Sequence, residues 1–562
     1  MPVADADSPL PPLAGGAAGP RALRPLIDAV LDTLATGARD RAGPLPPGGP
    51  AAVAATVRRT VGEALPAEGT GVDEALRALV HAVAVGAADP ADPHCAAHLH
   101  CPPLAVAVAA DLAASALNPS LDSWDQAPAA SELEALTSRA LAEVVYPATP
   151  SADALITTGG TESNQLALLL AREAARSGPA GAVRAPVTRL AARPAARTAA
   201  APRDLAPFAA PTEQLAELTE PLTDRLPDAL TEPLTDHSAD HPAQGPYPLP
   251  GPRRPPGSPH LGAHPPRVPH APPALRVVCG ENAHHSVVRA AWVLGLPDPI
   301  VVATPHGVLE PAAVAAALAG LPAHAPLLVV ATAGTTDSGA IDPLPALADV
   351  AAAHGARFHV DAAYGGPLLL SDAHAAKLRG IERAHTVTLD LHKLGWQPVA
   401  AGLLAVPDRA DLAPLGHRAD YLSADDDTEA GFPDLLGRSW RTTRRPDVLK
   451  VAVTLRALGR TGLAALIDRT CAAAQHLADL IAAHPDLELH SRPTISTVLF
   501  RPVGADPPAV ARARRRLLTE GRAVLGRAAR PDGLWLKATL LNPHTQPSDL
   551  EALVKLVEGH RT

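Results

Sequence analysis

Lysine is scarce in this sequence, and one lysine stands where amine chemistry could occur. Only five of the 48 Lys and Arg residues are lysines: Lys377, Lys393, Lys450, Lys537 and Lys555. A guanidinium stays protonated and cannot act as an amine nucleophile, whereas a partly buried ε-amine can lose its proton and form a Schiff base. Lys393 lies in the stretch DLHKLGWQP (390–398), directly after an apolar run. Taken alone, Lys393 would be interpreted as a solvated lysine after a strand, so a chemical role depends on the residues around it.

Three other stretches place polar residues directly after apolar runs of the kind that form buried strands. They are LITTGGT (155–161), LRVVCGENAHHS (275–286) and RFHVDAAYGG (357–366). In the first, glycines precede a leucine-rich helical pattern, so that backbone amides and the helix dipole could hold an anion. This turn has neither the lysine of a P-loop nor the three glycines of a dinucleotide fingerprint. Alone, it would equally be an ordinary turn between a strand and a helix.

The four stretches together supply a glycine-rich helix start, a histidine, an aspartate and a lysine. This combination meets the needs of pyridoxal 5'-phosphate, which requires an anion site, an amine for its aldehyde and a carboxylate beside its ring nitrogen. Asp361 suits the last role, since a negative charge favours the protonated ring nitrogen. A lone aspartate at a strand end is often a helix cap, but the combination is more specific than its members.

Strand-like and helical patterns alternate through the regions 327–344, 357–370 and 385–406. Such alternation predicts an α/β fold with a mostly parallel, doubly wound central sheet. In sheets of this kind the active site lies beyond the carboxyl ends of the strands.

The chain of 562 residues has room for two to four domains. Its first 90 residues hold three helical patterns, and we expect a dimerisation arm or, equally, a segment that docks on its own chain. The patterns cover about 21–38, 51–65 and 72–86, after a start of about 20 residues that should be frayed. Residues 91–410 are predicted to form the large cofactor-binding domain, and 411–562 a mobile loop followed by a small α+β domain. A Pro-rich, low-complexity insertion at 177–274 should be disordered.

Composition argues against several classes of function. The net charge is −10 without a long basic run, which disfavours nucleic acid and anionic membranes as partners. No apolar run reaches the ~18 residues of a membrane span, and the N-terminus lacks the pattern of a secretory signal. The scattered cysteines favour reduced thiols in the cytoplasm. A small-molecule substrate is therefore expected.

The stretch HCAAHLHCPPL (94–104) gathers three histidines and two cysteines. Their spacing does not reproduce that of structural zinc sites, so no metal is predicted and a pocket-lining turn is the preferred interpretation. Farther on, Trp124 stands beside Asp122 and Asp125, which could provide an apolar wall with acidic groups for a basic substrate.

Several blocks resemble the signatures of the pyridoxal-phosphate group II decarboxylases of fold type I. They are TTGGTESNQ, ATAGTT, HVDAAYGG and DLHKLGWQP. Within that family the chain is most similar to the bacterial L-2,4-diaminobutyrate and siderophore-pathway lysine decarboxylases. NPSLDSWDQ, RTTRRPDVLK and LKATLLNPHTQP extend the likeness, which covers about 90–176 and 275–560.

The resemblance implies a role for eight residues. Lys393 would be the Schiff-base lysine, Asp361 the partner of the pyridinium nitrogen, and His284 the ring stacked over the cofactor. The remaining implied contacts are Gly160 and Thr161 with the phosphate, Thr332 with ring substituents, Ala363 with the ring face and His392 on the phosphate side. The implied activity is decarboxylation of a basic L-amino acid such as lysine, 2,4-diaminobutyrate or ornithine by a homodimer.

Two departures from the family pattern bear on the mechanism. Asp390 stands where the branch acting on aromatic amino acids has Asn, and no tyrosine occurs between Leu422 and Trp440, where that branch has its proton donor. His284 or water would then have to deliver the proton. The alternatives are an acidic or aromatic substrate, an aminotransferase of the same fold, or a non-catalytic scaffold that binds through the Pro-rich insertion.

Overall fold

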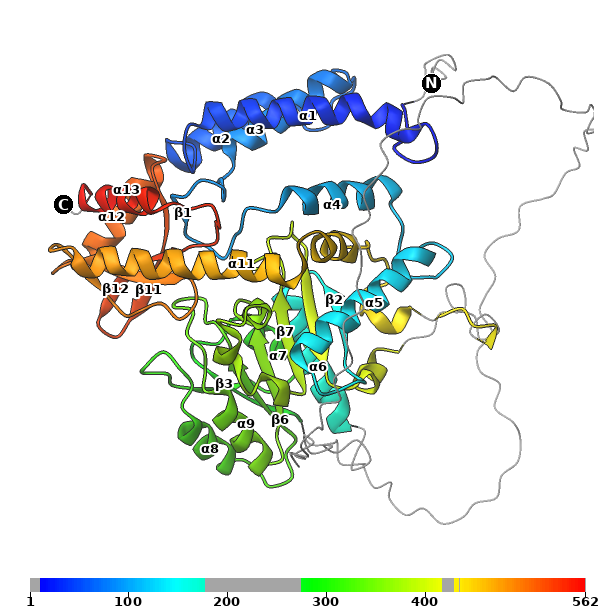
Figure 1. The fold of residues 1–562 in the computed structure, drawn as a ribbon, viewed down its shortest axis with the longest axis vertical. Helices are drawn as coiled ribbons and strands as arrows, with labels where there is room; N and C mark the ends of the chain where they lie inside the picture. The colour runs from blue at the N-terminus through cyan, green and yellow to red at the C-terminus, as the bar shows by residue number, and fades with distance from the viewer. Residues whose placement is uncertain (1–10, 177–273, 417–428, 434, 561–562) are drawn as a thin grey trace, which may run out of the picture. The chain divides into compact units, whose positions relative to one another are not determined.

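The site residues singled out above lie on, or shortly after, the strands of a seven-stranded sheet (Figure 1). Its strand order is β2-β8-β7-β6-β5-β3-β4. β8 pairs antiparallel with β2 and β7, whereas the other neighbours pair in parallel, so the predicted mostly parallel sheet is confirmed. The strand bounds are β2 Asp153–Thr157, β3 Arg276–Gly280, β4 Ile300–Val302, β5 Leu327–Thr332, β6 Arg357–Ala362, β7 Thr386–Asp390 and β8 Gly402–Val406.

The computed structural model describes residues 11–176, 274–416, 429–433 and 435–560, which all belong to one compact unit. The predicted disorder of the Pro-rich insertion falls outside these residues, apart from the insertion's last position. Residues 423–428 and 434 of the loop without a tyrosine are outside them as well.

Helices cover both faces of the large sheet. α6 (Gly160–Arg176) and α7 (Ser286–Val293) pack on one face. α5 (Pro128–Val145), α8 (Pro311–Ala319) and α9 (Leu344–Ala353) pack on the other. Neighbouring strand residues alternate between the two cores. A parallel sheet that is buried in this way needs apolar side chains on both faces.

On the face covered by α6, strands β6 and β7 carry polar side chains where apolar ones would be expected. Their apolar residues contribute to the core on the opposite face. Polar side chains alternate with them and are buried, namely His359, Asp361, Thr386, Thr388 and Asp390. Buried polar groups are costly unless they are hydrogen-bonded, so this polar strip needs partners from the covering helix.

A second sheet of five strands has the order β1-β11-β12-β10-β9. β1 pairs in parallel with β11, and the other strand pairs of this sheet are antiparallel. The strands are β1 Cys95–Ala96, β9 Leu487–Leu489, β10 Thr497–Pro502, β11 Val524–Arg530 and β12 Gly533–Thr539. The helices of this region are α11 Val448–Ala483, α12 Pro507–Thr519 and α13 Pro547–Glu558. α4 (Ala105–Leu117) packs along α11 (Figure 1).

The three predicted N-terminal helices are confirmed as α1 (Gly19–Arg41), α2 (Gly49–Val61) and α3 (Val72–Gly86). α1 packs against α3, and the buried Arg41 donates from Nη1 to the carbonyl of Ala84 at 2.8 Å. The two helices border an apolar groove lined by Leu23, Leu26, Ile27, Val30, Val72, Ala75, Leu76, Leu79 and Val80.

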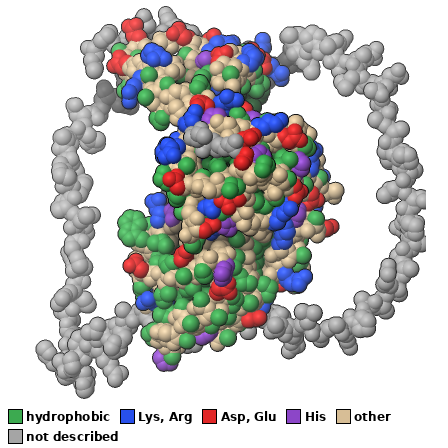
Figure 2. Space-filling view, turned by 90° about the vertical axis from the view of Figure 1, so that its left-hand side faces the viewer, with side chains coloured by type: hydrophobic (Ala, Val, Ile, Leu, Met, Phe, Trp, Pro, Cys, Tyr) green, Lys and Arg blue, Asp and Glu red, His purple; other side chains and the backbone are tan. Residues whose placement is uncertain are grey.

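Charged side chains of both signs are interspersed over the face seen in Figure 2. Among the described residues, no helix combines the length and apolarity that a bilayer span requires.

Candidate active site

A cavity of about 300 Å³ lies at the carboxyl ends of β5, β6 and β7, beside the start of α6. Its lining includes all eight residues that the sequence analysis proposed: Gly160, Thr161, His284, Thr332, Asp361, Ala363, His392 and Lys393. The other lining residues are Leu99, Thr158, Gly159, Asn164, Gly334, Thr336, Tyr364 and Asp390. Strand ends distant in the sequence therefore converge on one site, as expected for a doubly wound sheet.

The glycine turn before α6 forms one wall. A Cβ atom at Gly160 would come within 3.1 Å of the Ala363 Cβ and 3.2 Å of the Asp390 Oδ2, so a larger residue would fill the cradle. Glu162 fixes the turn, because its Oε2 accepts from both the N–H and the hydroxyl of Thr158 at 2.7 Å. The first N–H groups of a helix have no partner within it, so the wall presents donors suited to an anion.

Lys393 reaches the cavity next to two groups from its own stretch. Its Nζ lies 2.9 Å from the Asp390 Oδ2, and the lysine side chain is 17% exposed. The other oxygen of Asp390, Oδ1, is buried and has no hydrogen-bond partner among the described residues. His392 lies 3.2 Å from the Ala401 carbonyl through Nδ1, and burial lowers its pKa. The site thus holds an amine beside a carboxylate that can still accept a hydrogen bond.

The cysteine stretch supports this lysine from behind rather than forming a metal site. The buried Cys101 thiol donates to the His392 carbonyl at 3.2 Å, and burial raises its pKa to about 12, so it stays protonated. Of the stretch 94–101, only Leu99 lines the cavity, while Cys95 and Ala96 form the edge strand β1. The predicted pocket-lining turn is thus confirmed at Leu99 only, because pairing with β11 extends Cys95 and Ala96 away from the cavity lining. No group of metal-ligating side chains occurs in the part of the chain that the structure describes.

Asp361 is held in register with its neighbours across the sheet. It pairs with Thr332 on β5 and with Thr388 on β7. Its side chain is almost fully buried, with Oδ2 accepting from the Asn164 amide at 2.8 Å and Oδ1 from the Ala363 N–H at 3.1 Å. Two donors hold the carboxylate in one orientation at the cavity wall.

Asn164, which sequence reasoning gave no role, connects the polar strip to the cavity. Its Nδ2 donates to Asp361 and, at 2.8 Å, to the Ser286 hydroxyl. Its Oδ1 accepts from the Thr388 hydroxyl at 2.9 Å and lies 3.0 Å from the His359 Nε2. A signal for this group exists in the sequence, since FHVDA and TVTLD alternate polar and apolar residues where a buried parallel strand should be apolar throughout.

His284 lies two residues before α7 and lines the same cavity as the glycine turn. Its Nδ1 lies 2.8 Å from the Ser286 hydroxyl. Burial lowers its pKa, against the opposing effect of the Asp361 charge. The ring also contacts the His285 ring, with 4.1 Å between their centroids.

Asp122, Trp124 and Asp125 are not among the lining residues. The Asp122 carboxylate accepts from the Gln126 amide at 2.7 Å, and the Trp124 ring packs edge-on against Phe432. The expected acidic wall for a basic substrate is therefore not formed by these residues in this cavity.

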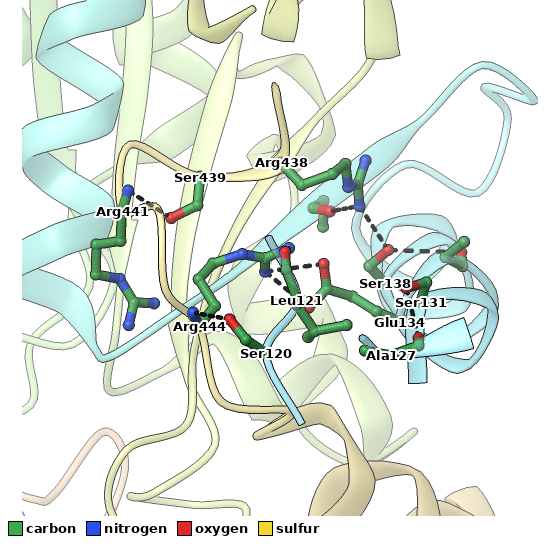
Figure 3. A network of polar contacts seen from close by, with 12 residues as sticks. Ser120, Leu121, Ala127, Ser131, Glu134, Ser138, Arg438, Ser439, Arg441 and Arg444 are labelled. Atoms are coloured by element: carbon green, nitrogen blue, oxygen red, sulfur yellow. Dashed lines mark hydrogen bonds and ion pairs between the residues drawn. The ribbon is translucent and has the colours of Figure 1, made fainter. Parts of the chain in front are cut away.

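A network of arginines fixes the end of the partly described loop and the segment that follows it (Figure 3). Arg444 pairs with both oxygens of Glu134 on α5, at 3.0 and 2.9 Å, and both side chains are buried. Arg438 donates to the Ser138 hydroxyl at 3.0 Å and to the Ala154 carbonyl at 2.6 Å. Arg441 pairs with Glu162, the residue that holds the glycine turn, at 2.9 Å.

Comparisons with known proteins bear on the chemistry of this cavity. The family model for the pyridoxal-dependent decarboxylase conserved domain matches residues 263–503. The chain is 35% identical to the L-2,4-diaminobutyrate decarboxylase of Rhizobium meliloti (strain 1021), over 88% of this chain and 83% of that protein. It is 30% identical to the L-2,4-diaminobutyrate decarboxylase of Acinetobacter baumannii, over 78% of this chain and 72% of that protein.

This chain belongs to the pyridoxal-dependent decarboxylase family. The decarboxylase also resembles a Vibrio parahaemolyticus crystal structure, described as the glutamate decarboxylase domain of diaminobutyrate-pyruvate transaminase and L-2,4-diaminobutyrate decarboxylase. The TM-score is 0.72 at 28% identity, over 98% of this chain and 97% of that one. Mouse CSAD, at 21% identity and a TM-score of 0.73, shares the fold. The predicted fold, enzyme class and cofactor are thereby confirmed.

The cavity of this decarboxylase fits pyridoxal phosphate. The cradle at Gly160 is open where a Cβ would close it, which leaves room for a phosphate against the helix start. Asp361 presents a carboxylate with two fixed donors, and Lys393 presents an amine. The orphaned Oδ1 of Asp390 provides one further acceptor in the same cavity.

Proposed function

We propose that this decarboxylase removes the α-carboxylate of a small basic L-amino acid, with 2,4-diaminobutyrate as the first candidate and ornithine and lysine as the next. The observation that carries the proposal is the convergence of Lys393, Asp361, His284 and the glycine turn on one cavity. The basic substrate is supported by the two relatives that act on 2,4-diaminobutyrate and match over most of their length.

Each residue in the proposal has one task. Lys393 would hold the cofactor covalently, the turn at Gly160 and Thr161 would bind its phosphate, and Asp361 would keep its ring nitrogen protonated. Pyridoxal phosphate, when bound, supplies an aldehyde and a cationic ring that accepts electrons from the bond being broken.

The remaining lining residues orient what is bound. His284 and Ala363 would border the two faces of the cofactor ring, with Thr332 beside its substituents and His392 on the phosphate side. Asp390 would orient the Lys393 amine, since its Oδ2 lies 2.9 Å from Nζ. This carboxylate-to-amine contact keeps the amine directed into the cavity.

We also propose a cytoplasmic homodimer in which the first 90 residues are a dimerisation arm. The apolar groove between α1 and α3 supports the arm, because apolar side chains that line it, such as Val72 and Leu79, are exposed. Four free cysteines are consistent with a reducing compartment.

The decisive experiment replaces Lys393 and a lysine outside the cavity. Lys393→Ala should abolish both the visible absorbance of the bound cofactor and the release of CO2, because no other lysine lines the described cavity. Lys377→Ala is the matched control, since its Nζ donates to the Thr494 carbonyl away from the site, at 2.7 Å. Retained absorbance and turnover in Lys393→Ala would contradict the assignment.

A panel of amino acids then identifies the substrate. We expect CO2 from 2,4-diaminobutyrate at a higher kcat/KM than from ornithine or lysine, and little from aspartate, glutamate or tyrosine. Keto-acid formation in place of CO2 would instead establish an aminotransferase. Equal turnover of tyrosine would contradict a basic substrate.

A further inference from the structure

The protonation of His284 is fixed by groups on its own turn. The backbone N–H of Ser286 points at the His284 Nδ1 over 3.3 Å. A backbone N–H can only donate, so a nitrogen that faces it must accept and cannot itself carry a hydrogen. The neutral imidazole therefore bears its hydrogen on Nε2.

A second donor reaches the same nitrogen. The Ser286 hydroxyl lies 2.8 Å from Nδ1, and it also accepts from the Asn164 amide at 2.8 Å. An oxygen that accepts from an amide keeps its own hydrogen free to donate. Ser286 thus directs both its N–H and its O–H at one ring nitrogen.

The orientation of the Asn164 amide is itself determined by its surroundings. Its Nδ2 must face Asp361, because an ionised carboxylate only accepts. On the other side, the Thr388 hydroxyl donates to Oδ1, which also lies 3.0 Å from the Nε2 of the fully buried His359. Rotating the amide by half a turn would set its oxygen against the Asp361 carboxylate, where no hydrogen is available.

These contacts form a directed chain from Asp361 through Asn164 and Ser286 to His284. We propose that Asn164 and Ser286 are positioning residues that hold His284 as the neutral Nε2–H tautomer, which makes it a fixed hydrogen-bond donor in the cavity and not a titrating acid. A neutral imidazole of this kind would have to become an anion to release its proton, and a cation would need a hydrogen on Nδ1, where the Ser286 N–H already points. The inference rests on the proposed function of the cavity.

Four charged or titratable groups surround the ring. Asp361 and Asp390 favour its cation, whereas Lys393 and His285 oppose it, together with burial. The two carboxylates come from the ends of β6 and β7, and the charge of Asp390 also acts on Lys393, with which it pairs. The donors of Ser286 act at the ring nitrogen itself, which decides where the hydrogen resides.

The test reads the tautomer directly. The full-length holoenzyme is labelled with ¹⁵N in its histidine rings, and the His284 signals are assigned by their loss in His284→Gln. We expect an unprotonated Nδ1 and a protonated Nε2 across the pH range in which the enzyme is active. A hydrogen on Nδ1, in either the neutral or the cationic form, would overturn the proposal.

Ser286→Ala removes one of the two donors and tests the consequence for turnover. Loss of one hydrogen bond should lower kcat by roughly three- to tenfold and allow the second tautomer to appear, while the cofactor dissociation constant stays unchanged. Ser131→Ala is the matched control, because Ser131 is buried and donates to the Ala127 carbonyl on α5. It should change neither readout.

The pH profile separates this role from acid catalysis. The pH profile of kcat for the wild type should show no limb that is lost in Ser286→Ala, because His284 does not titrate during turnover. A wild-type limb that requires protonated His284 would contradict the proposal. If no amino acid released CO2, the proposed function would fail, but the tautomer measured by NMR would still stand or fall independently.

Discussion

Two buried polar networks of this decarboxylase differ in the kind of contact that holds them together. Around Asn164, neutral amide, hydroxyl and imidazole groups surround one carboxylate, and the Asn164 amide donates to that carboxylate and to Ser286 and accepts from Thr388. Around Arg444 and Arg438, full charges are paired, and the contacts tie α5 and β2 to a segment about 300 positions later in the sequence (Figure 3). The first network sets protonation at the cavity, whereas the second joins distant parts of the chain.

The largest expected effect comes from breaking the charged network. Arg444→Met leaves the buried Glu134 carboxylate unpaired, which should lower the free energy of unfolding by about 3–5 kcal/mol. Urea denaturation measures the change. The double variant Arg444→Met/Glu134→Leu should regain most of that stability, because it removes the unpaired charge. A single variant as stable as wild type would show that this network does not anchor the segment.

A smaller effect is expected in the network around Asn164, where the free energy of unfolding should depend on pH through His359. Burial lowers the pKa of His359 from 6.5 to about 4 in the folded protein. Between these values the unfolded chain binds more protons, so stability falls as the pH drops from 6.5 towards 4. One such group contributes a slope of about 1.4 kcal/mol per pH unit.

His359→Gln should reduce the measured slope of unfolding free energy against pH by that amount. His385→Gln is the matched control, because burial also lowers the pKa of His385 to about 4, yet its Nδ1 accepts from the Phe358 N–H. Both variants should lose the same slope, but only His359→Gln should weaken cofactor binding. Equal cofactor affinity in the two variants would show that His359 does not contribute to the cofactor site.

The smallest effect is expected where the two networks meet. Arg441→Gln removes the ion pair with Glu162, which keeps its contacts with Trp440 and Thr158. Because Arg441 is about one third exposed, the loss of stability should stay within about 1 kcal/mol. Cofactor titration should show an affinity close to that of wild type. A large loss of affinity would mean that both networks act as one unit.

Much of the site could be predicted from residue types and local order. A rare lysine, a glycine turn, a histidine and an aspartate each follow an apolar run, and the fold brings such strand ends together. Residues such as Asn164, Ser286 and His359 were not predicted, because their importance lies in contacts with each other and not in their own chemistry. The pairing of Cys95 and Ala96 was not predicted, because their partner strand, β11, lies more than 400 residues later.

The sequence by itself determined which groups could do the chemistry and that parallel strands would carry them, because strand period and residue type are local properties. It also determined the family, through blocks whose residues lie next to one another in the chain. Only the tertiary structure decided how those groups are protonated and oriented. A hydrogen bond has a direction set by both of its partners, and in the chain from Asp361 to His284 the partners come from separate strands and helices.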